Sequence, residues 1–500
     1  MTATPTTPSS SLSVEQNGIN VISEGERTGA PRDLFWPWAA ANVSVLSISY
    51  GAFILGFGIS FWQATVAAVL GVVASFALCG LVALAGKRGS APTMVLSRAA
   101  FGVTGNAVPT FLSWLLLVGW ETVLVSLSTL ATATVFTELG WGGGTATKVV
   151  AFLVTAALVT GAGILGFSAI MRLQTLITIA TAVLTVGFIA LTVDTVDWGT
   201  VSGLESGSTQ AFVGALALAA TGFGVGWVNT AADYSRYLPR RSSGAGVFGW
   251  TTLGGAVAPL VLVVFGLLLV GSSAELGEAI GADPIGALTT ILPTWYLVPF
   301  AVVAVLGLVG GAVLDIYSSG LALLTLGLKV TRPVAAAIDG VIMTIGAIYV
   351  VFFADDFIGP FTGFLITVGV PIAAWCGIFI ADLALRHAPY ADAELYDTQG
   401  RYGAVQPAGV GLIALGTFLG WGLVTNTFAG WLDWQGYLLG PLGLGGREGD
   451  WAFANLGVFV ALLVGFLGWL LLGRTVVARQ ESKRSGGEAV LGPEALRRRP

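Results

Sequence analysis

Apolar runs of roughly twenty residues alternate with short polar segments along most of the chain. A transmembrane helix needs about 20 consecutive apolar residues to cross the hydrocarbon core of a bilayer. The pattern therefore predicts an all-α polytopic membrane protein with twelve transmembrane helices. The predicted spans lie near residues 36–58, 62–85, 108–136, 148–167, 172–193, 210–235, 247–271, 295–327, 333–353, 357–382, 407–427 and 452–473.

The two ends of the chain differ from these apolar runs. Residues 1–34 are rich in Ser, Thr, Pro and Gly and contain no apolar run, which is typical of a disordered tail. Residues 35–475 hold all twelve spans and form the predicted membrane domain. Residues 476–500 are polar again and are predicted to form a second tail on the same side of the membrane.

Composition and charge support a membrane location and indicate an orientation. Hydrophobic residues make up 55% of the chain, charged residues only 10%, and the mean hydropathy is +0.85. Soluble domains carry about 25% charged residues. Of the 22 Lys and Arg residues, 20 fall on one side of the predicted spans. Because basic residues concentrate in cytoplasmic loops, both termini are predicted to be cytoplasmic, in a multi-pass protein of the cell membrane.

Three alternating glycines interrupt the sixth span, in the stretch TGFGVGWVNTAADYSRYLPR at residues 221–240. Gly222 and Gly226 fit the small-residue pattern of packed transmembrane helices, whereas Gly224 points roughly the opposite way. Glycines are also a favourable place to leave helical geometry. Broken helices at mid-membrane mark the substrate site of many secondary transporters. The glycines therefore indicate either helix packing or a break.

The first span carries a matching irregularity. The stretch NVSVLSISYGAF places Asn42, Ser44, Ser47, Ser49 and Gly51 within an otherwise apolar run. Spans one and six hold equivalent positions in a five-plus-five inverted repeat. Because the two irregular spans are at equivalent positions, each supports the interpretation of the other as a broken helix.

Two ionisable residues lie inside predicted spans. Glu121 lies roughly midway along the third span, in LLLVGWETVLV, and Asp315 lies within the eighth, in GGAVLDIYSSG. A charged side chain at this depth is costly, so each residue is a functional-site hypothesis. The alternative is a polar contact that holds two helices together.

Other features narrow the class of protein. The chain has one histidine, His387, in a polar segment, and we find neither a metal-ligand set nor a nucleophile–base pair. The stretch GFGVGW lacks the βαβ context of a dinucleotide site. We therefore predict a transporter of a small molecule that is not an enzyme and has no cofactor, bound metal or nucleic-acid partner. A passive channel or a membrane sensor is the alternative from a different class.

Several motifs resemble the nucleobase–cation symporter-1 family, the purine/cytosine permeases and their hydantoin and allantoin relatives. The motifs are PWAAANVSVLSISYG, GISFWQA, APTMVLSRAAFGVTGN, VGW, ADYSRY and LYDTQGRYG, in this order along nearly the whole chain. The resemblance implies alternating access and the inverted-repeat fold of amino-acid–sodium symporters. Repeat one would cover about 36–193 and repeat two about 210–382, followed by two extra helices within about 407–473.

The resemblance also implies where a substrate would bind. Relatives stack a planar base between an aromatic residue of the third helix, which corresponds to Trp120, and one of the sixth. The sixth-helix position falls at Gly224, so the ring would come from Phe223 or Trp227. The break, which includes Gly222, would face the substrate.

A base-binding asparagine of the eighth helix corresponds to Asp315. Our hypothesis is that Asp315 contacts the base and carries a proton, with Glu121, which we also place at the substrate site, as the alternative carrier. Sodium-coupled relatives have hydroxyl side chains where this chain has Val309 and Gly310. Protons are therefore favoured over sodium.

The pair Asp233 and Arg236 closes the sixth span. It would act either as an intracellular gate or as an ordinary i, i+3 ion pair. Cytosine or a purine is the favoured substrate. Allantoin, a hydantoin or a vitamin such as thiamine or pyridoxine, with sodium coupling, is the alternative. The sequence leaves the oligomeric state open.

Overall fold

The computed structural model describes residues 14–15, 17–353, 358–426 and 430–488. Every regular element in these ranges is helical. Ten candidate spans are long and apolar enough to cross a membrane. They are α3 (Phe61–Gly89), α6 (Ala107–Glu138), α7 (Thr145–Leu165), α8 (Phe167–Thr192), α10 (Thr209–Gly222) continued by α11 (Ala231–Ser235), α12 (Gly244–Ser272), α14 (Leu297–Thr325), α15 (Arg332–Phe353), α16 (Ile358–Leu385) and α18 (Leu456–Glu488).

Two further elements occupy the remaining predicted places. The helices α1 (Phe35–Asn42) and α2 (Leu46–Leu55) form a pair bent by 65° at the first span. The eleventh place holds α17 (Pro407–Trp421), a shorter apolar helix. The described elements thus follow the predicted order, while length and hydropathy alone identify ten spans, or eleven with the bent pair. Short helices α4 (Thr93–Leu96), α5 (Arg98–Phe101), α9 (Trp198–Ser202) and α13 (Ala274–Ala282) connect them.

Capping residues explain where several helices begin. Ser60 accepts a hydrogen bond from the Gln63 amide at the start of α3, and the Gln63 side chain accepts one from the Ser60 amide in return. This reciprocal capping box satisfies two donors that the first helical turn leaves free. Ser208 and Ser243 cap α10 and α12 with their side-chain oxygens in the same way.

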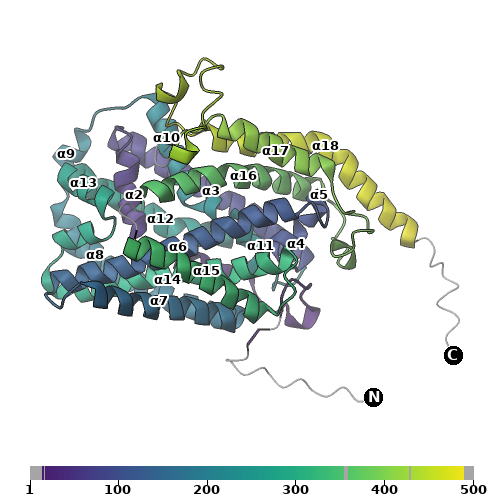
Figure 1. The fold of residues 1–500 in the computed structure, drawn as a ribbon, viewed down its shortest axis with the longest axis horizontal. Coiled ribbons are helices and arrows are strands. Elements are labelled where there is room, and N and C mark those ends of the chain that lie inside the picture. Colours follow the sequence, from purple (N-terminus) through teal and green to yellow (C-terminus); the bar gives the residue numbers. More distant parts are fainter. Residues whose placement is uncertain (1–13, 16, 354–357, 427–429, 489–500) are drawn as a thin grey trace.

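The helices of the two broken spans pack on neighbours from both halves of the chain, and Figure 1 shows how the helices are arranged. The helix α12 packs on α1, α2 and α3, while α14 packs on α1, α6, α7, α8 and α15. The last helices, α16, α17 and α18, pack on one another along one edge. Close approach of α2 and α12 requires Gly51 and Gly266, because a Cβ at either position would clash with the backbone of the other helix.

The described part of the N-terminal segment and the last turns of α18 lie toward one end of the bundle in Figure 1. We call this end the terminal side and the other end the opposite side. Parts of the predicted disordered tail at residues 1–34 and of the predicted C-terminal tail are helical there. Arg236 donates a hydrogen bond to the Gly18 carbonyl at 2.7 Å, and α18 continues to Glu488. The tail boundaries at 34 and 476 therefore do not match the described structure, because polar contacts order segments that hydropathy alone leaves unassigned.

Candidate functional site

Both of the irregular spans are broken helices. The helix α1 ends at Asn42, and α2 starts again at Leu46 after a bend of 65°. In the sixth span, α10 ends at Gly222, and Phe223 leaves helical geometry with φ −116° and ψ −108°. Two short 3-10 turns, Gly224–Gly226 and Val228–Thr230, follow before α11. The break predicted from the glycines is therefore confirmed.

The glycines of this break also serve close packing. A Cβ on Gly224 would clash with the backbone of Ser75 in α3. At this contact the Gly224 amide donates to the Ser75 hydroxyl at 3.0 Å, and the Cys79 thiol donates to the Gly224 carbonyl at 3.1 Å. Gly222 lies against the Tyr50 ring. Packing and breakage, which the sequence presented as alternatives, occur together because α3 satisfies the polar groups that the break exposes.

A small cavity of about 50 Å³ lies between the two breaks. Its wall contains the predicted site residues Trp120, Gly222, Phe223 and Trp227. The other lining residues come mainly from the first span and include Asn42, Ser44, Ser47, Tyr50 and Leu124. The cavity thus joins aromatic rings of the third and sixth spans to amide and hydroxyl groups of the first. Its volume is close to that of one or two water molecules, at about 30 Å³ each.

Three predicted site residues do not line this cavity. Gly224 faces α3, as described above. Asp315 lies eight residues beyond the lining residue Gly307, which corresponds to about 12 Å along a helix. Glu121 follows the lining residue Trp120, but its side chain is fully buried and accepts a hydrogen bond from Ser319 of α14 at 2.6 Å. Both carboxyl groups therefore lie behind the cavity wall in this conformation.

A larger cavity of about 600 Å³ approaches the small one from the opposite side. Leu46 and Tyr50 line both cavities. Its other walls include Phe53, Leu218 and Leu365, and Asp450 lies in the loop before α18. This volume is in the range of small-molecule sites. The arrangement is that of a vestibule leading to the break region from the opposite side.

Asp233 and Arg236 lie at the terminal side, and no ion pair between them is present among the described contacts. An Asp233 oxygen accepts hydrogen bonds from the Thr93 amide at 2.7 Å and the Thr93 hydroxyl at 2.8 Å. Arg236 is fully buried and donates to the Tyr317 hydroxyl at 2.7 Å. The predicted i, i+3 pair does not form among the described contacts, because the two side chains have partners on different elements.

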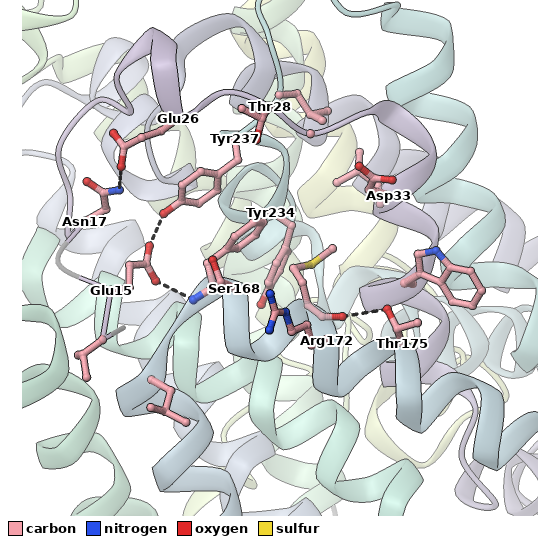
Figure 2. Close-up of a pocket in the computed structure, with 18 of the residues that line it drawn as sticks. Glu15, Asn17, Glu26, Thr28, Asp33, Ser168, Arg172, Thr175, Tyr234 and Tyr237 are labelled. Carbon is pink, nitrogen blue, oxygen red and sulfur yellow. Dashed lines mark hydrogen bonds between the residues drawn. The ribbon is translucent and has the colours of Figure 1, made fainter. Parts of the chain in front are cut away.

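Glu15 connects the terminal segment to three helical regions (Figure 2). One carboxylate oxygen lies 3.4 Å from Arg236 and accepts a hydrogen bond from Tyr237. The other accepts from the Phe167 amide at 2.7 Å and lies 3.6 Å from Arg332. Burial raises the pKa of Tyr237 to about 12, so this phenol remains a neutral donor to the carboxylate. A groove of about 1080 Å³ runs beside these contacts.

Sequence reasoning missed Glu15 and also Asp339. Glu15 lies in the segment 1–34, which composition predicts to be one disordered tail. Its signal in the sequence is that it is the first acidic residue and has apolar neighbours such as Ile19 and Ile22. Asp339 lies in the predicted ninth span, and its depth was a usable signal. In the structure it is fully buried and accepts a hydrogen bond from the Trp114 indole at 3.0 Å.

The segment around Gly310 shows how α1, α8 and α14 meet. The Ala40 carbonyl of α1 lies so close to Gly310 that a Cβ there would clash with it. The Gln174 side-chain amide of α8 donates to the Gly310 carbonyl at 2.7 Å. Val309 and Gly310 contribute no side-chain oxygen at this contact, because neither valine nor glycine has one.

Comparisons with known proteins agree with this geometry. A family profile described as permease for cytosine/purines, uracil, thiamine, allantoin matches residues 21–435. The chain is 23% identical over 410 residues to YxlA of Bacillus subtilis strain 168, whose name assigns it to the purine-cytosine permeases. That alignment covers 79% of this chain and 84% of YxlA.

Solved structures share the fold at low sequence identity. Mhp1, a nucleobase-cation-symport-1 family transporter, matches in a closed conformation with bromovinylhydantoin bound, at a TM-score of 0.66 and 19% identity over 95% of this chain and 100% of that one. Its inward-facing conformation matches at 0.66 and 17%, covering 94% and 98%. An outward-open Na⁺-coupled sialic acid symporter matches at 0.58 and 11%, covering 90% and 91%.

Proposed function

Since the chain belongs to the family of permeases for cytosine, purines, uracil, thiamine and allantoin, we propose that it imports a nucleobase or a related planar N-heterocycle by alternating access, in symport with protons. The terminal side is then the cytoplasmic side, in agreement with the basic residues there, and the protein works in the cell membrane.

The observation that carries this proposal is the meeting of two broken spans at a cavity that shares the lining residues Leu46 and Tyr50 with the larger vestibule. The vestibule leads to the cavity from the opposite side, while Thr93–Asp233 and Glu15–Arg236 contacts close the terminal side. Alternating access requires a central site that is open to one side and closed to the other. The described arrangement fits an outward-facing state that would open inward when the terminal contacts separate.

The lining of the cavity supports a flat, polar ring as substrate. Trp120 and Trp227 offer aromatic surfaces, and a planar heterocycle can stack on such surfaces. Asn42, Ser44 and Ser47 add amide and hydroxyl groups, which can pair with the ring nitrogens and carbonyls of a base. Cytosine or a purine fits this chemistry best. Allantoin, a hydantoin or thiamine would use the same surfaces.

Two features favour protons as the coupling ion. Buried carboxyl groups can bind protons, and the residues at the positions of the sodium ligands in relatives have no side-chain oxygen. Glu121 of α6 and Asp315 of α14 are both buried carboxyl groups. Buried carboxyl groups without a cation bind protons, because burial disfavours their charged form. Val309 and Gly310 provide no hydroxyl ligand for sodium, and the Gly310 carbonyl already accepts a bond from Gln174.

Uptake into liposomes that contain the purified protein tests this proposal. Radiolabelled cytosine, adenine, uracil, allantoin, hydantoin and thiamine would be supplied under an imposed proton gradient, an imposed sodium gradient or neither. We expect accumulation of at least one nucleobase under the proton gradient only. Accumulation driven by sodium would overturn the coupling, and transport of none of these compounds would overturn the substrate class.

A further inference from the structure

A buried group of carboxyl side chains joins three helices beside the cavity but outside its lining. Glu121 of α6 accepts a hydrogen bond from the Ser319 hydroxyl of α14 at 2.6 Å. Ser319 also interacts with the carboxyl group of Asp339 on α15. The Trp114 indole of α6 donates to Oδ1 of Asp339 at 3.0 Å. One hydroxyl therefore lies between the two acidic side chains.

Each of these acids keeps a buried oxygen without a partner. Oε2 of Glu121 and Oδ2 of Asp339 have no hydrogen-bond partner, and both side chains are 0% exposed. Asp315, one helical turn before Ser319 on α14, also has two buried oxygens without partners. A buried acceptor left without a hydrogen is unfavourable. A bound proton on a carboxyl oxygen would remove this deficit by turning an acceptor into a donor.

Among the residues that the structure describes, no cation forms an ion pair with this group. Glu121 lies on α6, which packs here against α7, α14, α15 and α16. Among the described residues of these helices, the charged groups that act on Glu121 are Asp339 and Asp315, and both are acidic. The nearest arginine along α15, Arg332, is directed to Glu15 and to the Gly163 and Ile164 carbonyls instead. Two carboxylates this close cannot both remain charged in a bilayer interior.

We propose that Glu121 and Asp339, bridged by Ser319, form a single proton-binding site that is separate from the substrate cavity and carries the coupling proton. This inference rests on the proposed proton symport and specifies which groups perform it. Asp315 then serves as a nearby acceptor, and its own protonation is not the coupling event. The proton is bound as an ordinary O–H bond on one carboxyl oxygen and is released when the site opens to water.

The position of the pair explains how proton binding can influence the cavity. Glu121 directly follows Trp120, which lines the cavity, so the two side chains move with the same turn of α6. Trp114, two turns earlier on α6, holds Asp339 of α15. With the proton bound, α6, α14 and α15 can stay packed; without it, two like charges would push α15 away from α6. Proton occupancy is thus linked to the packing behind the aromatic wall.

Infrared spectroscopy of the full-length protein in liposomes tests the shared site directly, through the carbonyl band of protonated carboxyl groups. The variants are Glu121→Gln, Asp339→Asn and the double substitution, with Asp315→Asn as the matched control. We expect each single variant to keep the band of one shared proton at neutral pH, because the remaining carboxyl group still lacks a cation. The double variant should lose it. Asp315→Asn should remove only the contribution of Asp315 to the band, and it should do so equally in the wild type and in the other three variants.

The same proteoliposomes report on coupling with radiolabelled cytosine as the probe. We expect the double variant to lose at least tenfold in accumulation driven by a proton gradient while it keeps cytosine exchange, and the single variants to retain driven uptake. Separate and additive band losses in the two single variants, or an intact band in the double variant, would overturn the shared site. If the double variant does not fold, the single variants provide the test. Loss of a whole carboxyl band in either single variant would contradict a proton shared by Glu121 and Asp339. If the wild type transports no probe, the proposed function fails, while the infrared result still stands for the proton site.

Discussion

The buried guanidinium of Arg236 lies 3.4 Å from the carboxylate of Glu15, although 221 positions separate the two residues in the sequence. This contact joins the terminal segment to the end of the sixth span. Arg236 also donates to Tyr317 on α14, and Glu15 lies close to Arg332 at the start of α15. One acidic side chain of a segment with little hydrophobic character thus contacts groups on several helices at the side that is closed.

Glu15→Gln should favour opening of the terminal side. Loss of one partner of a buried ion pair costs about 3–5 kcal/mol, and the partial exposure of Glu15 reduces the expected loss to about 1–2 kcal/mol. This corresponds to roughly tenfold in population. The measurement is labelling of Ser47→Cys from the cytoplasmic side, in a background without Cys79 and Cys376. Glu24→Gln, in the same segment but on an exposed side chain, is the control and should leave labelling unchanged.

Trp120→Ala should weaken substrate binding by about 1–3 kcal/mol, the usual contribution of an aromatic ring stacked on a base. Trp120→Phe should recover much of that affinity, because a ring remains in the cavity wall. Binding of the transported heterocycle to the purified protein measures both effects. Trp62→Ala, which removes an exposed ring of α3, is the control. Normal binding by a well-folded Trp120→Ala protein would place the substrate elsewhere.

Asp315→Asn distinguishes a substrate contact from a proton carrier. The amide keeps the size of the side chain and an acceptor oxygen but cannot bind a proton. Because the Glu121–Asp339 pair is proposed to carry the proton, driven uptake should persist, and affinity should change by no more than about tenfold (~1.4 kcal/mol). Sodium dependence should not appear, since Val309 and Gly310 are unchanged. Uptake in liposomes is the measurement, and loss of driven uptake with intact exchange would make Asp315 the carrier.

The segment after α16 should loosen at acidic pH. Hydrogen bonds from Arg401 hold the pKa of Glu394 below its usual range, helped by the Arg401 amide, which donates to the same carboxylate at 2.6 Å. A lowered pKa in the folded protein means that the contact stabilises the segment above the usual glutamate pKa. This contribution is lost as the pH falls through the folded value. The protection factor of the Arg401 amide, which is the exchange rate corrected for its intrinsic pH dependence, should therefore fall on acidification, and Glu394→Gln should abolish that change.

Single cysteines should label from opposite sides of the membrane according to the predicted topology. Tags at Arg241 and Arg401 should react with an impermeant reagent from the cytoplasm. Tags at Lys148 and Arg447 should react from outside, because an odd number of predicted spans separates each of them from the termini, whereas an even number separates Arg241 and Arg401 from the termini. Intact cells and inverted vesicles provide the two accessible faces. Exchange of any of these positions between the two faces would contradict the twelve-span topology.

Local sequence patterns determined much of the fold of this protein. The order of helices follows from the apolar runs, because a bilayer requires long apolar segments with internally satisfied backbones. The break at Gly222 was also visible locally, since glycine relaxes the backbone and a polar sequence follows it. Even the two tryptophans at the cavity, Trp120 and Trp227, belong to motifs that a single sequence displays.

Only the tertiary structure decided which side chains are partners. Asp233 and Arg236 have the spacing of an ion pair, yet Thr93 and Glu15 take them because those residues come close in space. Glu121 and Asp315 both stood out by depth, but their distance from the cavity depends on the tilt of α14 against α6. The role proposed for Asp339 depends on its position near Glu121 and Ser319, which only the tertiary structure shows. Hydropathy describes how well a segment suits the bilayer interior. Long-range contacts depend instead on how the helices pack, and the information that determines this packing is distributed over the whole chain.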